Sequence, residues 1–177
     1  MLSTATIQIP PTSLNWPPLG DGWFHWKEVD ANFWPKERRT RVAHPDLDFI
    51  KDSGGVYVIA WSVEKPCQKQ LHTCPQVKYI GETHCFKTRM GAFGTSAGFW
   101  GDRANGHSAG WSWEQGKVHN LWVAFFDVLN GVEMPTHLAM GLRKWVEAVA
   151  LEEHRQVNGR LPIVNTVRRN TIISLED

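Results

Sequence analysis

The stretch that decides the predicted fold is KYIGETHCFKTRM, residues 78–90. Its first residues belong to a β-strand, VKYIG at 77–81, because aromatic and β-branched residues lead up to a glycine. A helix follows over about residues 84–93, with Thr83 as its predicted N-cap. This strand, turn and helix would bring Tyr79 and Arg89 to the same side of the fold.

The strand partner of this stretch is predicted immediately upstream. VYVIAW at 56–61 is rich in β-branched and aromatic residues and follows two glycines, which indicates a buried strand. The polar connection 62–76 contains two prolines and joins this strand to strand 77–81. A hairpin with a long loop is the simplest connection between them.

Downstream, the predicted elements complete a small α+β domain. The glycine-rich segment 94–116 is expected to be mostly loop, and loops of this length in compact domains are commonly functional. A third strand covers 117–129. The best helix of the chain starts at Pro135 and is closed by Gly159. The predicted order is β-β-α-β-α, a three-stranded antiparallel sheet flanked by helices.

The chain is predicted to form one domain with two appendages. Its 177 residues suffice for a single hydrophobic core and little more. Residues 1–53 are rich in proline and tryptophan and are expected to be an extension that packs on the core. The core covers 54–166, and 167–177 is a short tail.

Composition excludes several classes of protein. Hydrophobic residues make up 42% and the net charge is +1, so this is no globally basic nucleic-acid-binding domain, and such binding would need local patches. Basic clusters occur at 36–41 and 155–169, where solvated surface is the alternative. The ten tryptophans are expected in the core, with base stacking as the alternative. The apolar runs are too short to span a membrane and no signal peptide is evident, so a cytoplasmic location is expected.

One acidic residue stands out on the long helix. Projected at 100° per residue, Glu153 falls within the helix's apolar face, where a carboxylate is costly unless it is paired or binds a metal. The alternative is that this face has already reached solvent. The residues that form the apolar face are Ala139, Leu142, Val146, Val149, Ala150 and Val157. The two tyrosines of the chain, Tyr57 and Tyr79, each lie in a strand beside a glycine, and simple core packing is the alternative to a functional role.

Taken together, these residues resemble the GIY-YIG nuclease family over about residues 54–166. Its first motif corresponds to Gly55-Val56-Tyr57, with valine for isoleucine, and its second to Tyr79-Ile80-Gly81. The family's arginine stands eight residues after the second motif, as Arg89 does here. In the bacterial excision-repair relatives, a proline and an asparagine follow the metal-binding glutamate. The corresponding residues here are Glu153, Pro162 and Asn165, spaced by nine and twelve residues.

The resemblance implies a Mg²⁺- or Mn²⁺-dependent endonuclease that hydrolyses DNA phosphodiester bonds. Glu153 would be the metal ligand, and Arg89, with Lys87, would bind the phosphate. Tyr57 would take a proton from the attacking water and Tyr79 would orient the reacting groups. Magnesium suits such a site, because it needs few protein ligands.

Three departures from the family pattern have consequences for the site. The connection between the two tyrosine motifs is long, and Glu82 follows YIG where many relatives have lysine. Phe93 stands where some members have a histidine, so His107, in a Gly-His-Ser segment like that of restriction-type members, is the candidate for catalysis and substrate binding. Asn165 is expected to brace the site. A plain surface histidine is the alternative for His107.

Several alternatives remain open at this stage. The nuclease could be restriction-like, which is favoured and would suit a homodimer on a palindromic site, or a structure-specific repair or recombination enzyme. It could also be a non-catalytic nucleic-acid-binding module on the same fold. Three cysteines make a disulfide scaffold unexpected. A structural Zn²⁺ site is the alternative to free cysteines, and its candidate ligands are Cys67, His72, Cys74 and Cys85, with His84 nearby.

Overall fold

The computed structural model describes residues 18–20, 22–34, 45–67, 69–129, 131–167 and 172–175. The chain is an α+β protein with an antiparallel sheet of strand order β1-β4-β2-β3. The strands are β1 (Trp23–His25), β2 (Gly55–Trp61), β3 (Val77–Thr83) and β4 (Leu121–Asp127). The helices are α1 (Trp26–Phe33), α2 (Pro45–Ile50), α3 (Phe86–Ala97), α4 (Ser108–Ser112), α5 (Thr136–Asn158) and α6 (Ile163–Thr166), with the 3-10 turn η1 (Leu71–Thr73).

The described sheet has four strands, so the expectation of three was wrong. The additional strand, β1, comes from the segment interpreted as an extension and pairs antiparallel with β4, Phe24 opposite Val123. It is only three residues long, and the proline- and tryptophan-rich sequence around it shows no strand periodicity. This strand forms by pairing with the exposed edge of β4, and its own sequence does not indicate that pairing.

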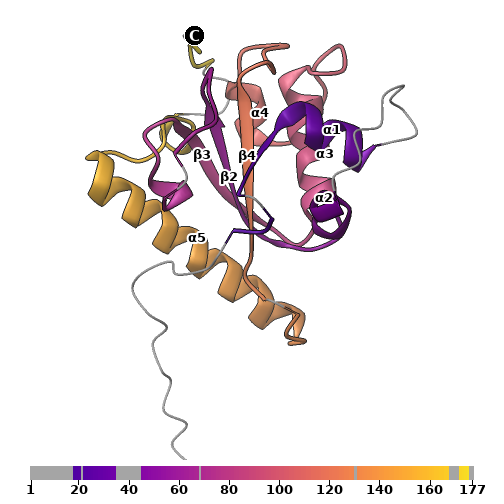
Figure 1. Cartoon of the computed structure of the whole chain (residues 1–177), viewed down its shortest axis with the longest axis vertical. Helices are drawn as coiled ribbons and strands as arrows, with labels where there is room; N and C mark the ends of the chain where they lie inside the picture. The colour runs from indigo at the N-terminus through magenta and orange to yellow at the C-terminus, as the bar shows by residue number, and fades with distance from the viewer. Residues whose placement is uncertain are drawn as a thin grey trace, which may run out of the picture.

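Two hydrophobic clusters cover the two faces of the sheet. One contains Tyr57, Ile59 and Phe125 and packs against α1, α2, α3 and α4. The other contains Val58 and Ile80 and packs against α5 and η1. Figure 1 shows α5 running diagonally across the sheet, with α1 to α4 grouped apart from it. Alternate residues of β2 therefore face different helices, as the two-residue period of a strand requires.

Helix α3 differs from its prediction at both ends. Its N-cap is Cys85, not Thr83, although the Thr83 hydroxyl accepts the Cys85 N–H at 3.1 Å. It continues to Ala97 and ends at Gly98, which has a φ of 73°. The segment predicted as loop, 94–116, thus contains the last turn of α3 and the short helix α4, which packs on α3.

Helix α5 has the predicted bounds, between Pro135 and Gly159. Its buried face is narrower than the apolar face that the sequence predicts, since Val157 is 64% exposed. Two polar residues lie on the buried face instead. Arg143 pairs with Glu82 at 3.4 Å, and His154 is almost fully buried.

Two further features concern the connections. Cys67 and Cys74 form a disulfide within the β2–β3 connection, contrary to the expectation of free cysteines. In the C-terminal segment, Ile173 and Leu175 are buried in the same cluster as Tyr57. Across the described ranges, no helix has the length and apolar character needed to cross a membrane.

Candidate functional site

The two tyrosines lie side by side on the face of the sheet that α3 covers. In the β2–β3 ladder Tyr57 is opposite Gly81 and Ile59 is opposite Tyr79, which makes the two phenols diagonal neighbours. Their ring centroids are 5.9 Å apart. A Cβ atom on Gly81 would come within 2.7 Å of the Tyr57 hydroxyl, so only glycine permits this approach. This explains why glycine follows Tyr79-Ile80.

His107 holds the hydroxyl of Tyr57. Its Nε2 lies 2.6 Å from the Tyr57 oxygen. Its Nδ1 accepts the backbone N–H of Ala109 at 3.0 Å, so the neutral ring carries its proton on Nε2 and donates it to Tyr57. The Tyr57 proton is then directed to the Tyr79 oxygen. Burial, with Arg89 adding to it, lowers the pKa of His107 to about 3, so the ring stays neutral.

The loop that carries His107 is fixed on α3 by close backbone packing. The His107 N–H lies 3.1 Å from the Ser96 hydroxyl, which in turn donates to the His107 carbonyl at 2.9 Å. A Cβ on Gly106 would overlap the Ala92 carbonyl, and one on Gly110 would overlap Ser96. The glycines around His107 are therefore what lets this loop reach the tyrosines.

Arg89 projects from α3 into the same group of residues. Its positive charge lowers the pKa values of Tyr57 and Tyr79, against the larger effect of burial. Among the described residues, no hydrogen bond or ion pair engages its half-buried guanidinium. Lys87, two residues earlier, donates its backbone N–H to the Lys51 carbonyl at 2.9 Å. Arg89 is thus positioned near the phenols, and the N–H donors of its guanidinium are available to a ligand.

The carboxylate that accompanies this group is Glu147 of α5. Burial, followed by the negative charge of Glu82, raises its pKa to about 7, while Arg89 and Lys144 act in the opposite direction. Its charge in turn raises the pKa values of both tyrosines. No hydrogen bond holds its carboxylate within the ranges that the structure describes. Glu147 was not singled out from the sequence, because it lies outside the spacing to Asn165 that selected Glu153.

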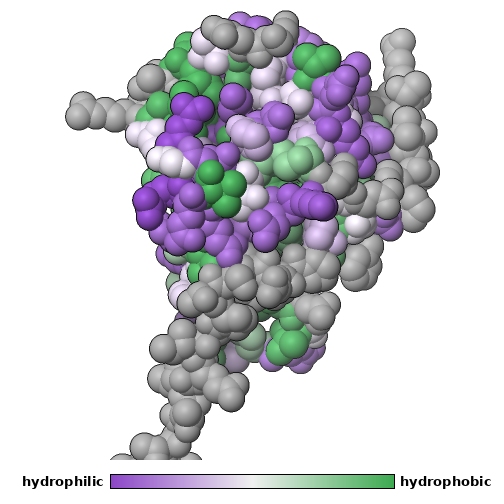
Figure 2. All heavy atoms as spheres, turned by 60° about the vertical axis from the view of Figure 1, so that its left-hand side comes forward, coloured by the Kyte–Doolittle hydropathy of each residue, from purple (hydrophilic) through white to green (hydrophobic). Residues whose placement is uncertain are grey.

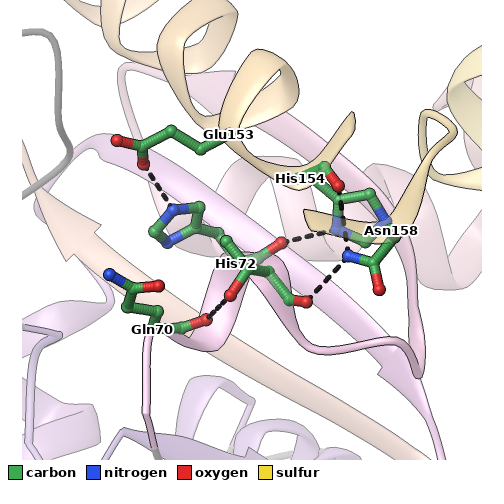
Figure 3. A network of polar contacts seen from close by, with 6 residues as sticks. Gln70, His72, Glu153, His154 and Asn158 are labelled. Carbon is green, nitrogen blue, oxygen red and sulfur yellow. Dashed lines mark hydrogen bonds and ion pairs between the residues drawn. The ribbon is translucent and has the colours of Figure 1, made fainter. Parts of the chain in front are cut away.

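Glu153 lies elsewhere on the same helix. Its carboxylate meets His72 Nε2 at 2.6 Å, in a network that fastens η1 to α5 (Figure 3). His154 Nδ1 donates to the His72 carbonyl at 2.7 Å, and Asn158 donates to the Thr73 carbonyl at 2.8 Å. The predicted need of Glu153 for a partner on the buried face is met by a histidine. The carboxylate whose charge acts on both tyrosines is that of Glu147, whereas Glu153 is hydrogen-bonded to His72.

Asn165 lies against the outer edge of β3. Its side-chain amide donates to the Ile80 carbonyl at 2.8 Å, and its oxygen accepts the Ile80 N–H at 3.0 Å. These two bonds continue the sheet ladder on the edge of β3 where none of the described strands pairs. They hold the backbone directly after Tyr79 in place, so Asn165 positions the strand that carries the second phenol.

Burial distinguishes the two phenols. Tyr57 is fully buried, and this is the main reason why its pKa lies well above the ordinary value. Tyr79 is half-buried, and burial raises its pKa as well. In this conformation water can approach Tyr79 more readily than Tyr57. If Tyr79 lost its proton, the hydrogen bond that Tyr79 accepts from Tyr57 would stabilise the resulting phenolate.

The cysteines do not assemble the zinc site considered above. Cys67 and Cys74 are bonded to each other, and His72 is engaged with Glu153. Cys85 is at the start of α3, where its sulfur lies 3.7 Å from the Lys51 carbonyl. Over the described part of the chain, no group of three or more histidine, cysteine or acidic residues is placed to hold a metal ion.

Comparisons with protein-family models, curated proteins and solved structures gave no match to this chain.

Proposed function

We propose that the chain is a Mg²⁺-dependent endonuclease that hydrolyses DNA phosphodiester bonds, as its resemblance to the GIY-YIG nucleases suggests. The observation that carries the proposal is the grouping of two phenols, a guanidinium and a carboxylate. They come from β2, β3, α3 and α5, which are far apart in the sequence. These are the groups needed to orient water, bind a phosphate and bind a metal.

Each residue has a role that follows from its position. Arg89 binds the scissile phosphate through its planar guanidinium. Tyr79, the phenol nearer to solvent, orients the attacking water and receives a hydrogen bond from Tyr57. His107 keeps Tyr57 in place and stays neutral. Tyr57 thus supports Tyr79 in this conformation, and its expected role as the direct base would require the site to open.

Glu147, rather than Glu153, fits the role of the metal ligand. Its half-buried carboxylate lies near a second carboxylate, Glu82, and its raised pKa reflects an environment in which negative charge is poorly compensated. A divalent cation suits such a place, and Mg²⁺ commonly uses one or two carboxylates with water filling its other positions. When bound, the ion would polarise the phosphate and stabilise the leaving oxygen.

Metal binding at Glu147 predicts a pH-dependent stabilisation. Because the folded-state pKa of Glu147 is raised, stability without metal falls as pH rises from about 4.5 through 7. Mg²⁺ binds the ionised carboxylate, so it should raise the melting temperature more at about pH 8 than at about pH 6. Glu147→Gln should remove the Mg²⁺ effect, whereas Glu152→Gln, on the exposed face, should keep it. Equal stabilisation of both variants would contradict the assignment.

The test of the proposed function is incubation of the purified chain with plasmid DNA and Mg²⁺, with and without EDTA. Mg²⁺-dependent cleavage is expected, and Arg89→Ala should slow it roughly a hundredfold or more, since one charge-stabilising group is lost. Sequencing of the ends shows whether cleavage is site-specific.

The full burial and raised pKa of Tyr57 favour a second candidate, a non-catalytic nucleic-acid-binding module. DNA binding without any metal-dependent cleavage would identify it.

A further inference from the structure

A cavity lies at the C-terminal end of α5, and its lining contains none of Tyr57, Tyr79, Arg89 and Glu147. Its volume is about 270 Å³, and β3, α5 and the turn leading into α6 enclose it. Its lining consists of Pro75, Val77, Lys78, His154, Asn158, Arg160, Leu161, Pro162 and Ile163. The apolar side chains of the lining form part of its wall, and the polar side chains provide hydrogen-bonding groups. This size suits a phosphate group or a single nucleotide unit better than a drug-sized ligand.

The polar lining of the cavity is cationic. Lys78 and Arg160 contribute positive charge, and no acidic side chain of the described residues belongs to the lining. The nearby exposed Arg155 does not line the cavity, and its guanidinium is paired with Glu152 at 2.6 and 2.8 Å. Among the described arginines of the basic cluster 155–169, Arg160 is therefore the one that lines the cavity.

His154 supplies a buried polar group with an unused atom. It is 3% exposed, and its Nδ1 donates to the His72 carbonyl at 2.7 Å (Figure 3). Within the described residues, no hydrogen bond engages its Nε2. Burial lowers the pKa of His154, so the neutral ring keeps its proton on Nδ1 and offers Nε2 as an acceptor, not as a donor. The charged or titratable groups around it are Lys78, Arg160 and His72, with Glu153 beyond His72.

The cavity lies along the β3 edge from the candidate site. Lys78 directly precedes Tyr79, and Ile163 belongs to the same short helix as Asn165. Seven residues of α5 separate Glu147 from His154, which corresponds to about 10 Å along the helix. Successive phosphates of one DNA strand advance by about 3.4 Å along the duplex axis, so the separation spans a few nucleotides. Figure 2 shows this side of the molecule, which is largely hydrophilic with scattered apolar residues.

We propose that this cavity binds a DNA backbone phosphate a few nucleotides away from the scissile one. The inference rests on the proposed function for its ligand, but its chemistry is independent of cleavage. Lys78 and Arg160 bind the phosphate oxygens, and His154 forms the floor of the site. The contact positions the strand along β3, without reading its sequence, as phosphate contacts generally do.

The test measures binding of a fluorescent duplex by anisotropy in EDTA, where no cleavage occurs, over a range of salt concentrations. Lys78→Ala and Arg160→Ala should each weaken binding roughly fivefold and lower the slope of log K against log salt by about one. Arg155→Ala, which removes an arginine outside the cavity, should leave affinity and slope unchanged. Circular dichroism establishes that each variant is folded.

Direct occupancy is tested by following the His154 imidazole resonances by NMR. Titration with the duplex should shift them in the wild type, and the Arg160→Ala variant should need roughly fivefold more duplex for the same shift. A parallel titration with inorganic phosphate distinguishes the source. Shifts with phosphate but none with DNA would overturn the proposal, because the site would then serve a free anion.

Unchanged duplex affinity in both cavity variants, or an equal loss in Arg155→Ala, would also overturn it. Failure of the proposed function gives a different result. A chain that never cleaves DNA but binds it through Lys78 and Arg160 retains this phosphate site as a nucleic-acid-binding module. A chain that cleaves DNA normally and is indifferent to both substitutions retains the nuclease proposal and loses this one.

Discussion

At the scale of single residues, hydrogen bonds to one imidazole organise the candidate site. The backbone N–H of Ala109 fixes which nitrogen of His107 carries the proton, and that proton fixes the direction of the Tyr57 hydroxyl. Tyr57 can then donate only toward Tyr79. The hydrogen bonds thus run from the backbone of Ala109 to the imidazole, then to the buried phenol and on to the half-buried phenol. Each link is neutral in the resting protein, because burial disfavours every charged form along it.

The link between His107 and Tyr57 predicts a stability effect. Tyr57→Phe removes the acceptor of a buried N–H, so it should lower the free energy of unfolding by about 1–3 kcal/mol. The measurement is urea denaturation of the purified variant.

Its control is the same substitution in a His107→Leu background, where the Nε2–H that donates to Tyr57 is absent from both proteins compared. The cost of Tyr57→Phe should be clearly smaller there. An equal cost in both backgrounds would show that the hydrogen bond contributes nothing to stability.

At the scale of elements, strand β3 links the elements that contribute residues to the candidate site. Its Tyr79 faces α3, its Glu82 faces Arg143 of α5, and its outer edge is bonded to Asn165. The connection before β3 is fastened to α5 through His72 and Glu153. This strand is therefore held from both faces and from its edge, which suits a position where geometry matters.

The packing of the α4 loop on α3 gives an element-scale prediction with a matched control. Gly110→Ala should destabilise the protein by about 1–3 kcal/mol, because its Cβ would overlap Ser96 and displace the loop that carries His107. Gly141→Ala, in open space on α5, should instead stabilise it by about 0.5–1 kcal/mol, since alanine is the better helix former.

Thermal melts of both variants measure the effect. A stable Gly110→Ala protein with unaltered His107 resonances would contradict the packing argument.

The sequence was informative where local signals decide the structure. Proline and glycine at 135 and 159 predicted the bounds of α5, and β-branched runs predicted β2 and β3. Strand β1 was missed because its pairing partner lies about a hundred residues away. Helix α4 was missed because a glycine-rich stretch resembles a loop, whereas two of its glycines serve close packing.

The same limit applies to the candidate site. The family resemblance suggested that Tyr57 and Tyr79 belong to one site, and the strand, turn and helix around Gly81 predicted that Arg89 lies on the same side as Tyr79. The carboxylate could not be chosen in this way. Glu147 and Glu153 both lie on α5, and which of them interacts electrostatically with the tyrosines depends on how that helix crosses the sheet. Sequence spacing carries no information about that crossing.

At the scale of the whole molecule, the two acidic residues of α5 have separate tasks. Glu147 is half-buried and interacts electrostatically with Arg89 and both phenols, and Glu153 fastens η1 to the helix. Beyond Glu153, the proposed phosphate cavity occupies the end of α5. The helix thus joins the proposed site of chemistry to the proposed phosphate site, with the Glu153–His72 contact between them.

The most direct test compares plasmid cleavage by Glu147→Gln and Glu153→Gln under identical conditions with Mg²⁺. The account predicts that Glu147→Gln slows cleavage roughly a hundredfold or more. It predicts that Glu153→Gln cleaves at close to the wild-type rate, because glutamine can still hydrogen-bond His72. Loss of cleavage in Glu153→Gln, with Glu147→Gln fully active, would contradict the central claim.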